Sequence, residues 1–223
     1  MEAFLPIASL PMDQQPTPID EQKRRLRKRM RALRLVADQK EGPNAARQVT
    51  GHVLGHLAEL GIRPGAVVAG YWPIITELDV RPLMARLDAA GIVCALPAIV
   101  GECDVLRFRR WRPTDDVEIA SLDTRQPPAS APEVIPDVLL VPLLAVDRSG
   151  NRLGQGKGWY DRTLAALRRQ GRPVAVGIGF DVQVIAHVPH GPGDETMDWV
   201  ASEQAIEASA VKAAAPSIGQ GQL

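Results

Sequence analysis

Residues 150–161, G-N-R-L-G-Q-G-K-G-W-Y-D, bring together glycines, cations, aromatic side chains and a carboxylate. The glycines let the backbone adopt left-handed conformations and let a ligand approach with no side chain in the way. A helix expected to begin at Trp159 presents free N–H groups and the positive end of its dipole, which favour an anion. Lys157 and Arg152 add a point charge and a planar fork that suit phosphate oxygens. The stretch therefore predicts a phosphate-binding loop.

Two named nucleotide motifs do not fit this stretch. A P-loop needs Ser or Thr after its lysine, where this chain has Gly158, and G-Q-G-K-G has the wrong spacing for the dinucleotide fingerprint. A glycine-rich turn with solvated charges is the alternative to a phosphate loop. Asp161 also has two interpretations. It is either an acid in the first turn of a helix or a ligand of Mg²⁺, which takes one or two protein carboxylates beside phosphate oxygens and water.

A basic segment lies near the N-terminus, where eight of the twelve residues 23–34 are Lys or Arg. Such a run is typical of a solvated helix face or a nucleic-acid stripe. Lys23 and Arg27 are four residues apart and share a helical face, where two cations repel each other unless an anion lies between them. These two are expected to bind an anion, and the other six are expected to be solvated.

The run from Gly150 to Leu164, G-N-R-L-G-Q-G-K-G-W-Y-D-R-T-L, closely resembles the signature of the 5-formyltetrahydrofolate cyclo-ligases, also called methenyltetrahydrofolate synthetases. Three further segments follow the order of that family: the helix opening with Lys23 and Arg27, Y-W-P-I-I-T-E-L-D-V at 71–80, and M-D-W-V-A-S-E at 197–203. The resemblance implies an enzyme that uses ATP and Mg²⁺ to cyclise 5-formyltetrahydrofolate to 5,10-methenyltetrahydrofolate. ADP and phosphate are released after phosphorylation of the formyl oxygen.

The same resemblance implies roles for individual residues. Lys157 and Arg152 are expected to act on the phosphate being transferred, and Asp161 and Asp198 to bind Mg²⁺, with Asp194 and Glu195 as alternatives to Asp198. The residues implied to contact ATP are Lys23, Arg27, Arg152, Leu153, Gly154, Gln155, Gly156, Lys157, Gly158, Trp159 and Tyr160.

Folate contacts are implied for Trp72, Glu77 and Tyr160. A pterin ring offers a ring N–H and an exocyclic amine side by side, and one carboxylate accepts both while an aromatic wall covers the ring face. Glu77 follows Trp72 and the end of a predicted strand, which suits such a pocket. The alternative is that Glu77 caps the next helix.

Two other functions stay open at this stage. A relative that binds folate and ATP without turnover is one, because Trp159 replaces a more usual tyrosine and Val146 a more usual phenylalanine. An RNA-binding module is a more distant one, and 26 basic against 26 acidic residues with few aromatic side chains disfavour it.

The elements that must position these residues alternate along the chain. Continuously apolar strands separated by helices predict a three-layer α/β/α single domain with a mostly parallel central sheet. The predicted strands cover 66–71, 92–96, 105–108, 138–142 and 174–178. The first predicted helix begins near Thr17. A second follows Gly42-Pro43 and runs to Leu60, and two more cover about 80–90 and 159–169.

Composition sets the remaining expectations. The length of 223 residues with 45% hydrophobic content suits one globular core, placed at 17–205 between flexible tails at 1–16 and 206–223. Two cysteines form no disulfide framework, and no apolar run is long enough to cross a bilayer. We therefore expect a cytoplasmic monomer or homodimer that binds small molecules, with no nucleic-acid or membrane partner.

Overall fold

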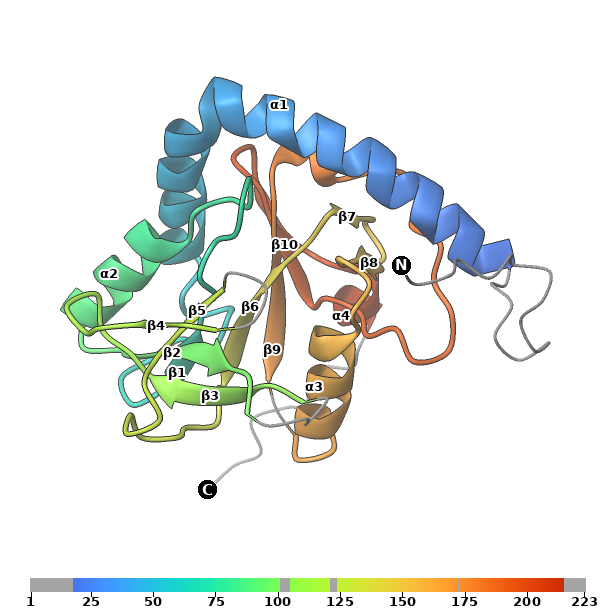
Figure 1. Cartoon of the computed structure of the whole chain (residues 1–223). Helices are drawn as coiled ribbons and strands as arrows, with labels where there is room; N and C mark the ends of the chain where they lie inside the picture. The colour runs from blue at the N-terminus through green and yellow to red at the C-terminus, as the bar shows by residue number, and fades with distance from the viewer. Residues whose placement is uncertain (1–17, 101–104, 121–123, 172, 215–223) are drawn as a thin grey trace, which may run out of the picture.

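The computed structural model describes residues 18–100, 105–120, 124–171 and 173–214 (Figure 1). Its central sheet has seven strands in the order β11-β10-β9-β6-β1-β2-β3. The bounds are β1 Val67–Ala69, β2 Val93–Ala98, β3 Arg107–Arg110, β6 Val138–Pro142, β9 Val174–Ile178, β10 Trp199–Ala201 and β11 Ile206–Ala208. The five inner strands pair in parallel, and β3 and β11 add antiparallel edges. The prediction of a mostly parallel sheet is confirmed.

Helices cover both faces of this sheet. The helices are α1 Pro18–Gly55, α2 Arg81–Ala89, α3 Trp159–Arg168 and α4 Ala210–Ala214, with a short 3₁₀ turn, η4, at Asp181–Gln183. Residues of α1 and α2 pack with Val68, Leu140 and Val176 on one face, whereas Leu164 of α3 packs with Leu139 on the other. Successive side chains of a strand thus pack on opposite faces of the sheet and belong to two separate cores, which gives the predicted three layers.

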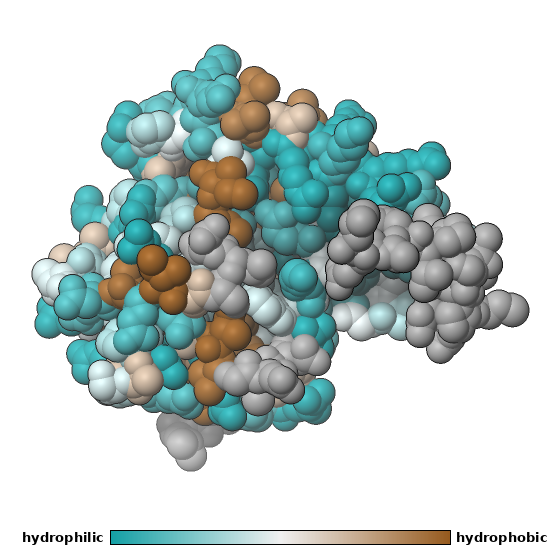
Figure 2. All heavy atoms as spheres, in the orientation of Figure 1, coloured by the Kyte–Doolittle hydropathy of each residue, from teal (hydrophilic) through white to brown (hydrophobic). Residues whose placement is uncertain are grey.

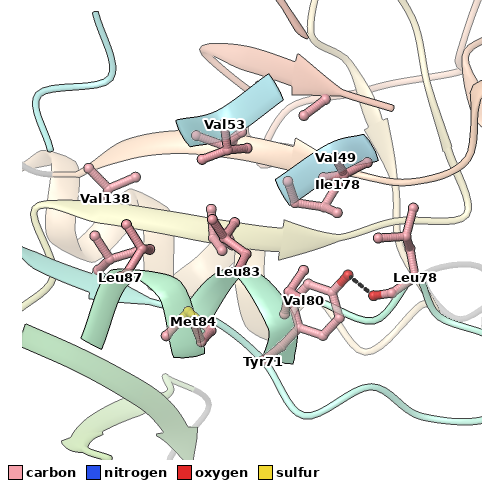
Figure 3. Packing of buried hydrophobic residues seen from close by; sticks show 14 of the residues in the cluster. Val49, Val53, Tyr71, Leu78, Val80, Leu83, Met84, Leu87, Val138 and Ile178 are labelled. Atoms are coloured by element: carbon pink, nitrogen blue, oxygen red, sulfur yellow. Dashed lines mark hydrogen bonds between the residues drawn. The ribbon is translucent and has the colours of Figure 1, made fainter. Parts of the chain in front are cut away.

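The core beneath α1 and α2 is the larger one. Figure 3 shows part of it, where side chains of both helices gather around β6 and β9. The hydroxyl of buried Tyr71 donates a hydrogen bond of 2.7 Å to the Leu78 carbonyl oxygen, so this polar group is satisfied inside an apolar cluster. That bond ties the end of β1 to the start of α2.

The N-terminal helix differs from the prediction of two helices. A single helix of 38 residues, α1, runs through Gly42 and Pro43. A proline inside a helix removes one hydrogen bond and kinks the axis, and the second half of α1 turns sharply toward α2 (Figure 1). The two halves have separate contacts, since Met30 packs in a small cluster with Leu144 and Leu153 while Val53 packs over the main sheet.

The predicted C-terminal tail begins too early at 206. Ile206–Ala208 forms the edge strand β11, where Ile206 pairs with Ala201 and packs in the core beneath α1. A short sequence of this kind pairs because the neighbouring β10 edge supplies partners for its backbone. The predicted N-terminal tail, residues 1–16, lies outside the described residues, as do 215–223.

No helix within the described ranges is both long enough and apolar enough to cross a bilayer. Figure 2 shows hydrophilic residues over most of the visible face, with hydrophobic residues in a few small groups. The exposed side of α1 follows this pattern and carries only Leu35 and Val36 as large exposed apolar side chains.

Two small two-stranded sheets flank the main one: β4 Glu118–Ile119 with β5 Arg125–Gln126, and β7 Ala145–Val146 with β8 Arg152–Leu153. The turn between β7 and β8 is organised by buried Asp147. Its carboxylate accepts the backbone N–H groups of Ser149 at 3.0 Å, Asn151 at 3.1 Å and Val188 at 3.0 Å. This turn sets the direction of β8, and therefore the position of the glycine-rich loop that follows β8.

We expect Gly150→Ala to destabilise the fold strongly. Gly150 has φ +88°, and an added Cβ would lie 2.3 Å from the carbonyl oxygen of Met197. Gly65, at φ +86° with no atom within 4 Å, is the matched control for backbone strain alone. Urea denaturation should show a loss of about 1–2 kcal/mol for Gly65→Ala and about 3 kcal/mol or more for Gly150→Ala. Equal losses would show that the close approach to Met197 does not matter.

Candidate active site

A cavity of about 300 Å³ opens at the carboxyl ends of the central parallel strands. Tyr71 follows β1, Pro97 lies near the end of β2, and Pro142 ends β6, and all three line the cavity. Ligands of open α/β sheets bind at this edge, because the loops after the parallel strands converge there. The N-terminal half of α1 and the start of α3 complete the wall.

Nearly all of the residues predicted to bind ligands line this one cavity. Lys23 and Arg27 come from α1, Trp72 and Glu77 from the segment after β1, and the rest from 152–161. These segments lie far apart in the sequence, so their convergence is a property of the fold. Asp198 is the one predicted site residue that does not line the cavity.

The glycine-rich segment 154–158, hereafter the phosphate loop, connects β8 to α3. Gly158 has φ +69° and is the N-cap of α3, and Gly156 has φ +105°. An added Cβ at Gly156 would lie 3.2 Å from Cζ of Arg27, whose Nε donates a 2.9 Å hydrogen bond to the Gly154 carbonyl oxygen. The glycines therefore allow the loop to lie against α1 while the first N–H groups of α3 stay available to an anion.

Arg152 and Asp161 form an ion pair at the base of the loop. Arg152 Nη2 lies 3.0 Å from Asp161 Oδ2, and Arg152 Nη1 donates to the Pro142 carbonyl oxygen at 3.2 Å. Arg152 Nε is buried without a partner among the described residues. The Arg152 guanidinium also lies over the ring of Tyr160, 5.7 Å from its centroid. Arg152 is thus held rigidly, whereas Lys157 lies exposed at the tip of the loop.

The carboxylates expected to bind a metal are only partly brought together. Asp161 lines the cavity and accepts the Glu195 N–H at 3.3 Å. Asp198 instead accepts the Ala175 N–H at 2.8 Å and pairs with Arg168 at 3.2 Å, so it joins β10 to β9. Arg168 also holds Glu195 at 2.5 Å.

Asp194, the other alternative, does line the cavity and pairs with Lys23 at 2.5 Å. Across the described part of the chain, no three His, Cys, Asp or Glu side chains gather into a metal-binding group. Mg²⁺ needs only one or two protein carboxylates when phosphate oxygens and water supply the rest. The donor set at Asp161 therefore fits Mg²⁺ bound together with a phosphate ligand.

Glu77 is buried deep in the cavity wall and is paired with a residue that the sequence did not reveal. Arg34 Nη1 lies 3.6 Å from Glu77 Oε1, and the two side chains are 3% and 6% exposed. Arg34 Nε also donates to the Thr76 hydroxyl at 3.0 Å. The expectation that all six remaining cations of the basic segment are solvated is wrong for Arg34. The signal that could have found it is position, because Arg34 lies two helical turns after Arg27 on the same face.

Burial dominates the electrostatics of this pair. It raises the pKa of Glu77, and the nearby Arg34 opposes that rise only in part. Burial also lowers the pKa of Arg34. Glu77 Oε2 accepts the Ile74 N–H at 3.2 Å, whereas α2 has no side-chain cap. Glu77 therefore does not cap the next helix, and it presents a desolvated carboxylate to the cavity.

Aromatic side chains wall the same end of the cavity. Trp72 is half-buried and packs edge-on against Trp111, with ring centroids 6.2 Å apart. Burial raises the pKa of Tyr160, so its hydroxyl stays neutral. Trp159 lines the cavity and also packs against the core beneath α3, as expected of a residue with a packing role.

Comparison with known proteins shows which family this chain resembles. A model of the 5-formyltetrahydrofolate cyclo-ligase family matches residues 19–203. The 5-formyltetrahydrofolate cyclo-ligase of Escherichia coli (strain K12) is 31% identical over 172 residues, covering 74% of this chain and 88% of the relative. That of Mycolicibacterium smegmatis is 35% identical over 188 residues, with the same coverage.

A solved structure agrees with the sequence relatives. The NMR structure of Aquifex aeolicus 5,10-methenyltetrahydrofolate synthetase superposes with a TM-score of 0.69 at 25% identity, covering 84% of this chain and 93% of that one. The family match spans α1, the segment from Tyr71 to Val80, the phosphate loop and β10. The chain therefore belongs to the 5-formyltetrahydrofolate cyclo-ligase family.

Proposed function

We propose that this protein uses ATP and Mg²⁺ to cyclise 5-formyltetrahydrofolate to 5,10-methenyltetrahydrofolate, releasing ADP and phosphate. The observation that carries the proposal is one cavity that gathers Lys23, Arg27, the phosphate loop and Glu77. Cations and free loop N–H groups suit the phosphates of a nucleotide. A buried carboxylate beside an aromatic wall suits a flat ring with adjacent N–H donors. The names of the relatives from E. coli and M. smegmatis support the same reaction.

The chemistry begins with a poor leaving group, the formamide oxygen. In the proposed course this oxygen attacks the terminal phosphorus of ATP, and the bond from that phosphorus to the ADP oxygen breaks. The neighbouring secondary amine of the folate then adds to the formyl carbon and loses its proton. Phosphate departs with the electron pair of the former C–O bond, which leaves the methenyl bridge.

The protein contributes to such a transfer mainly by positioning the reactants and neutralising charge. In this proposal Lys23, Arg27 and the loop N–H groups bind the phosphates, while Lys157 and Arg152 neutralise charge on the group being transferred. Asp161 would hold Mg²⁺, which supplies further neutralising charge when bound. Asp198 acts through the β9–β10 pairing that it supports, because its oxygen already bonds the Ala175 N–H and Arg168.

At the folate end, Glu77 would accept the paired N–H groups of the pterin. Arg34 holds the carboxylate in place, and Trp72 and Tyr160 line the space beside it. Because Glu77 is deeply buried, water supplies few hydrogen bonds to its carboxylate. A ligand with two N–H donors would supply them, which offsets the cost of burying the charge. This end of the cavity therefore selects for a ring with that donor pattern.

The test is a reconstitution assay with 5-formyltetrahydrofolate, ATP and Mg²⁺, each omitted in turn. The near-ultraviolet absorbance of the methenyl product should rise only in the complete mixture, with one ADP released per product. Binding of folate and ATP without any rise would instead identify a binding protein that lacks turnover. Calorimetric titration of both ligands separates that outcome from a misfolded sample.

We expect Lys157→Ala to lower kcat/KM by about 100-fold, because it removes a cation from the phosphate undergoing transfer. Lys157 is exposed, so thermal stability should not change. Lys28→Ala removes an exposed lysine of α1 that does not line the cavity and should behave as the parent protein. Parent-like turnover by Lys157→Ala would remove Lys157 from the mechanism.

A second prediction concerns pH. Because burial raises the pKa of Glu77, its carboxylate begins to take up a proton at a higher pH than an exposed glutamate does as the pH falls. Only the ionised form accepts two N–H groups, so KM for the folate should rise as pH falls through that raised pKa. KM for ATP should not follow the same curve.

The groups that face Glu77 are Arg34, Tyr71, Tyr160, Gln155 and the Ile74 N–H. Neither tyrosine ionises in this range, since burial raises the pKa of both. Glu77→Gln should therefore raise KM for the folate and flatten its pH profile. Glu59→Gln, at an exposed site away from the cavity, is the control. A pH profile that survives in Glu77→Gln would assign the titration to another group.

A further inference from the structure

The Glu77 side chain lies in the cavity wall, yet little of its surface is open. Its exposed fraction is 6%, its Oε2 accepts the Ile74 N–H at 3.2 Å, and Arg34 Nη1 lies 3.6 Å from its Oε1. A ring that donates two N–H groups must bring both nitrogens to about 3 Å from the carboxylate oxygens. A carboxylate this closed has no room for both, so one of the groups around Glu77 must move before such a ring binds.

Gln155, from the phosphate loop, is a third group at this carboxylate. Its side chain hydrogen-bonds Glu77. Its Oε1 accepts two N–H groups of Arg31, from Nη2 at 3.0 Å and from Nε at 3.3 Å. Because a guanidinium only donates, Oε1 faces Arg31, and the amide Nε2 is the group that donates to Glu77. The amide is thus held between a cation of α1 and the carboxylate.

The three groups differ in how easily they can leave Glu77. The Ile74 N–H belongs to the same backbone turn, since the Glu77 N–H donates to the Ile74 carbonyl oxygen at 3.1 Å. The Arg34 side chain is 3% exposed and packed inside the fold. Gln155 is exposed, lines the cavity and stands between two glycines, which put no side chain in its way. Gln155 is therefore the group that can be displaced without unpacking the core.

We propose that Gln155 is a gate on Glu77, so that the folate binds by displacing the Gln155 amide from the carboxylate. This inference rests on the proposed function, in which the pterin N–H groups bond Glu77. The amide and the pterin compete for the same oxygens, so the bond from Gln155 lowers the affinity for the folate. In return, the gate satisfies a buried carboxylate that water reaches poorly.

The experiment measures the Kd of 5-formyltetrahydrofolate by calorimetry, without nucleotide, for the parent protein, Gln155→Ala and Gln170→Ala. Gln170 is an exposed glutamine that does not line the cavity, which makes it a matched control with the parental Kd. Gln155→Ala should lower the Kd about two- to tenfold, the range expected when one competing hydrogen bond is lost. An unchanged Kd would overturn the gate, and a higher Kd would do so by making Gln155 a contact of the folate.

Arg31 provides a second test, because its guanidinium orients the gate. It is exposed and does not line the cavity. Without Arg31 the amide oxygen of Gln155 loses its partner, so Arg31→Ala should also lower the Kd, by less than Gln155→Ala does. In the Gln155→Ala background the same substitution should have no further effect. A further effect there would show that Arg31 acts through its charge, and would overturn its part in the gate.

Failure of the proposed function is visible separately, as the absence of methenyl product when the parent protein receives the complete mixture. The comparison of Kd values requires no turnover, so it decides the gate in that case as well. If neither the parent protein nor Gln155→Ala binds the folate, the proposed function and the gate both fail.

Discussion

The contact between α1 and the phosphate loop is the constraint on which the cavity depends. The hydrogen bond from Arg27 Nε to the Gly154 carbonyl oxygen joins residues 127 positions apart, and Lys23 reaches Asp194 across 171. The contact of Arg27 requires a loop backbone that approaches the helix closely, which Gly156 allows by having no side chain. The contact of Lys23 joins the same half of α1 to the segment that precedes β10. Without this closure the cations of α1 would face solvent, and the cavity would lack one wall.

The same helix carries one member of a buried ion pair. Arg34 and Glu77 are both buried and lie 3.6 Å apart. Burial lowers the pKa of Arg34 and raises the pKa of Glu77, so in both cases it favours the neutral form. Their mutual attraction therefore does not fully offset the loss of water. Such a pair is tolerated where a ligand completes its hydrogen bonds, and perturbed groups in a cleft are typical of functional sites. The geometry of α1 thus links the phosphate end of the cavity to its folate end.

The sequence predicted those features that local patterns determine. Continuous apolar runs identified β1, β2, β6 and β9, and the glycine spacing identified the loop of left-handed glycines that leads into α3. Features decided by tertiary contacts were missed or misjudged. Gly42-Pro43 reads locally as a helix end, yet packing on both sides keeps α1 continuous. A count of basic residues cannot show that Arg34 points inward. Nothing in the local sequence indicates that Arg168 and the Ala175 N–H both donate hydrogen bonds to the Asp198 carboxylate.

Charge inside the cavity is arranged in sectors although the whole chain has equal numbers of acidic and basic residues. Lys23 and Arg27 lie on α1 beside the loop and Lys157 lies in it, whereas Glu77 is buried in the cavity wall beside Arg34. In the proposed reaction both substrates are anions, so a uniformly positive cavity would bind either one in either place. In this proposal the buried carboxylate of Glu77 accepts N–H donors, which favours the pterin at that end over the phosphates. Orientation of the formyl oxygen toward the terminal phosphate then follows from local charge rather than from net charge.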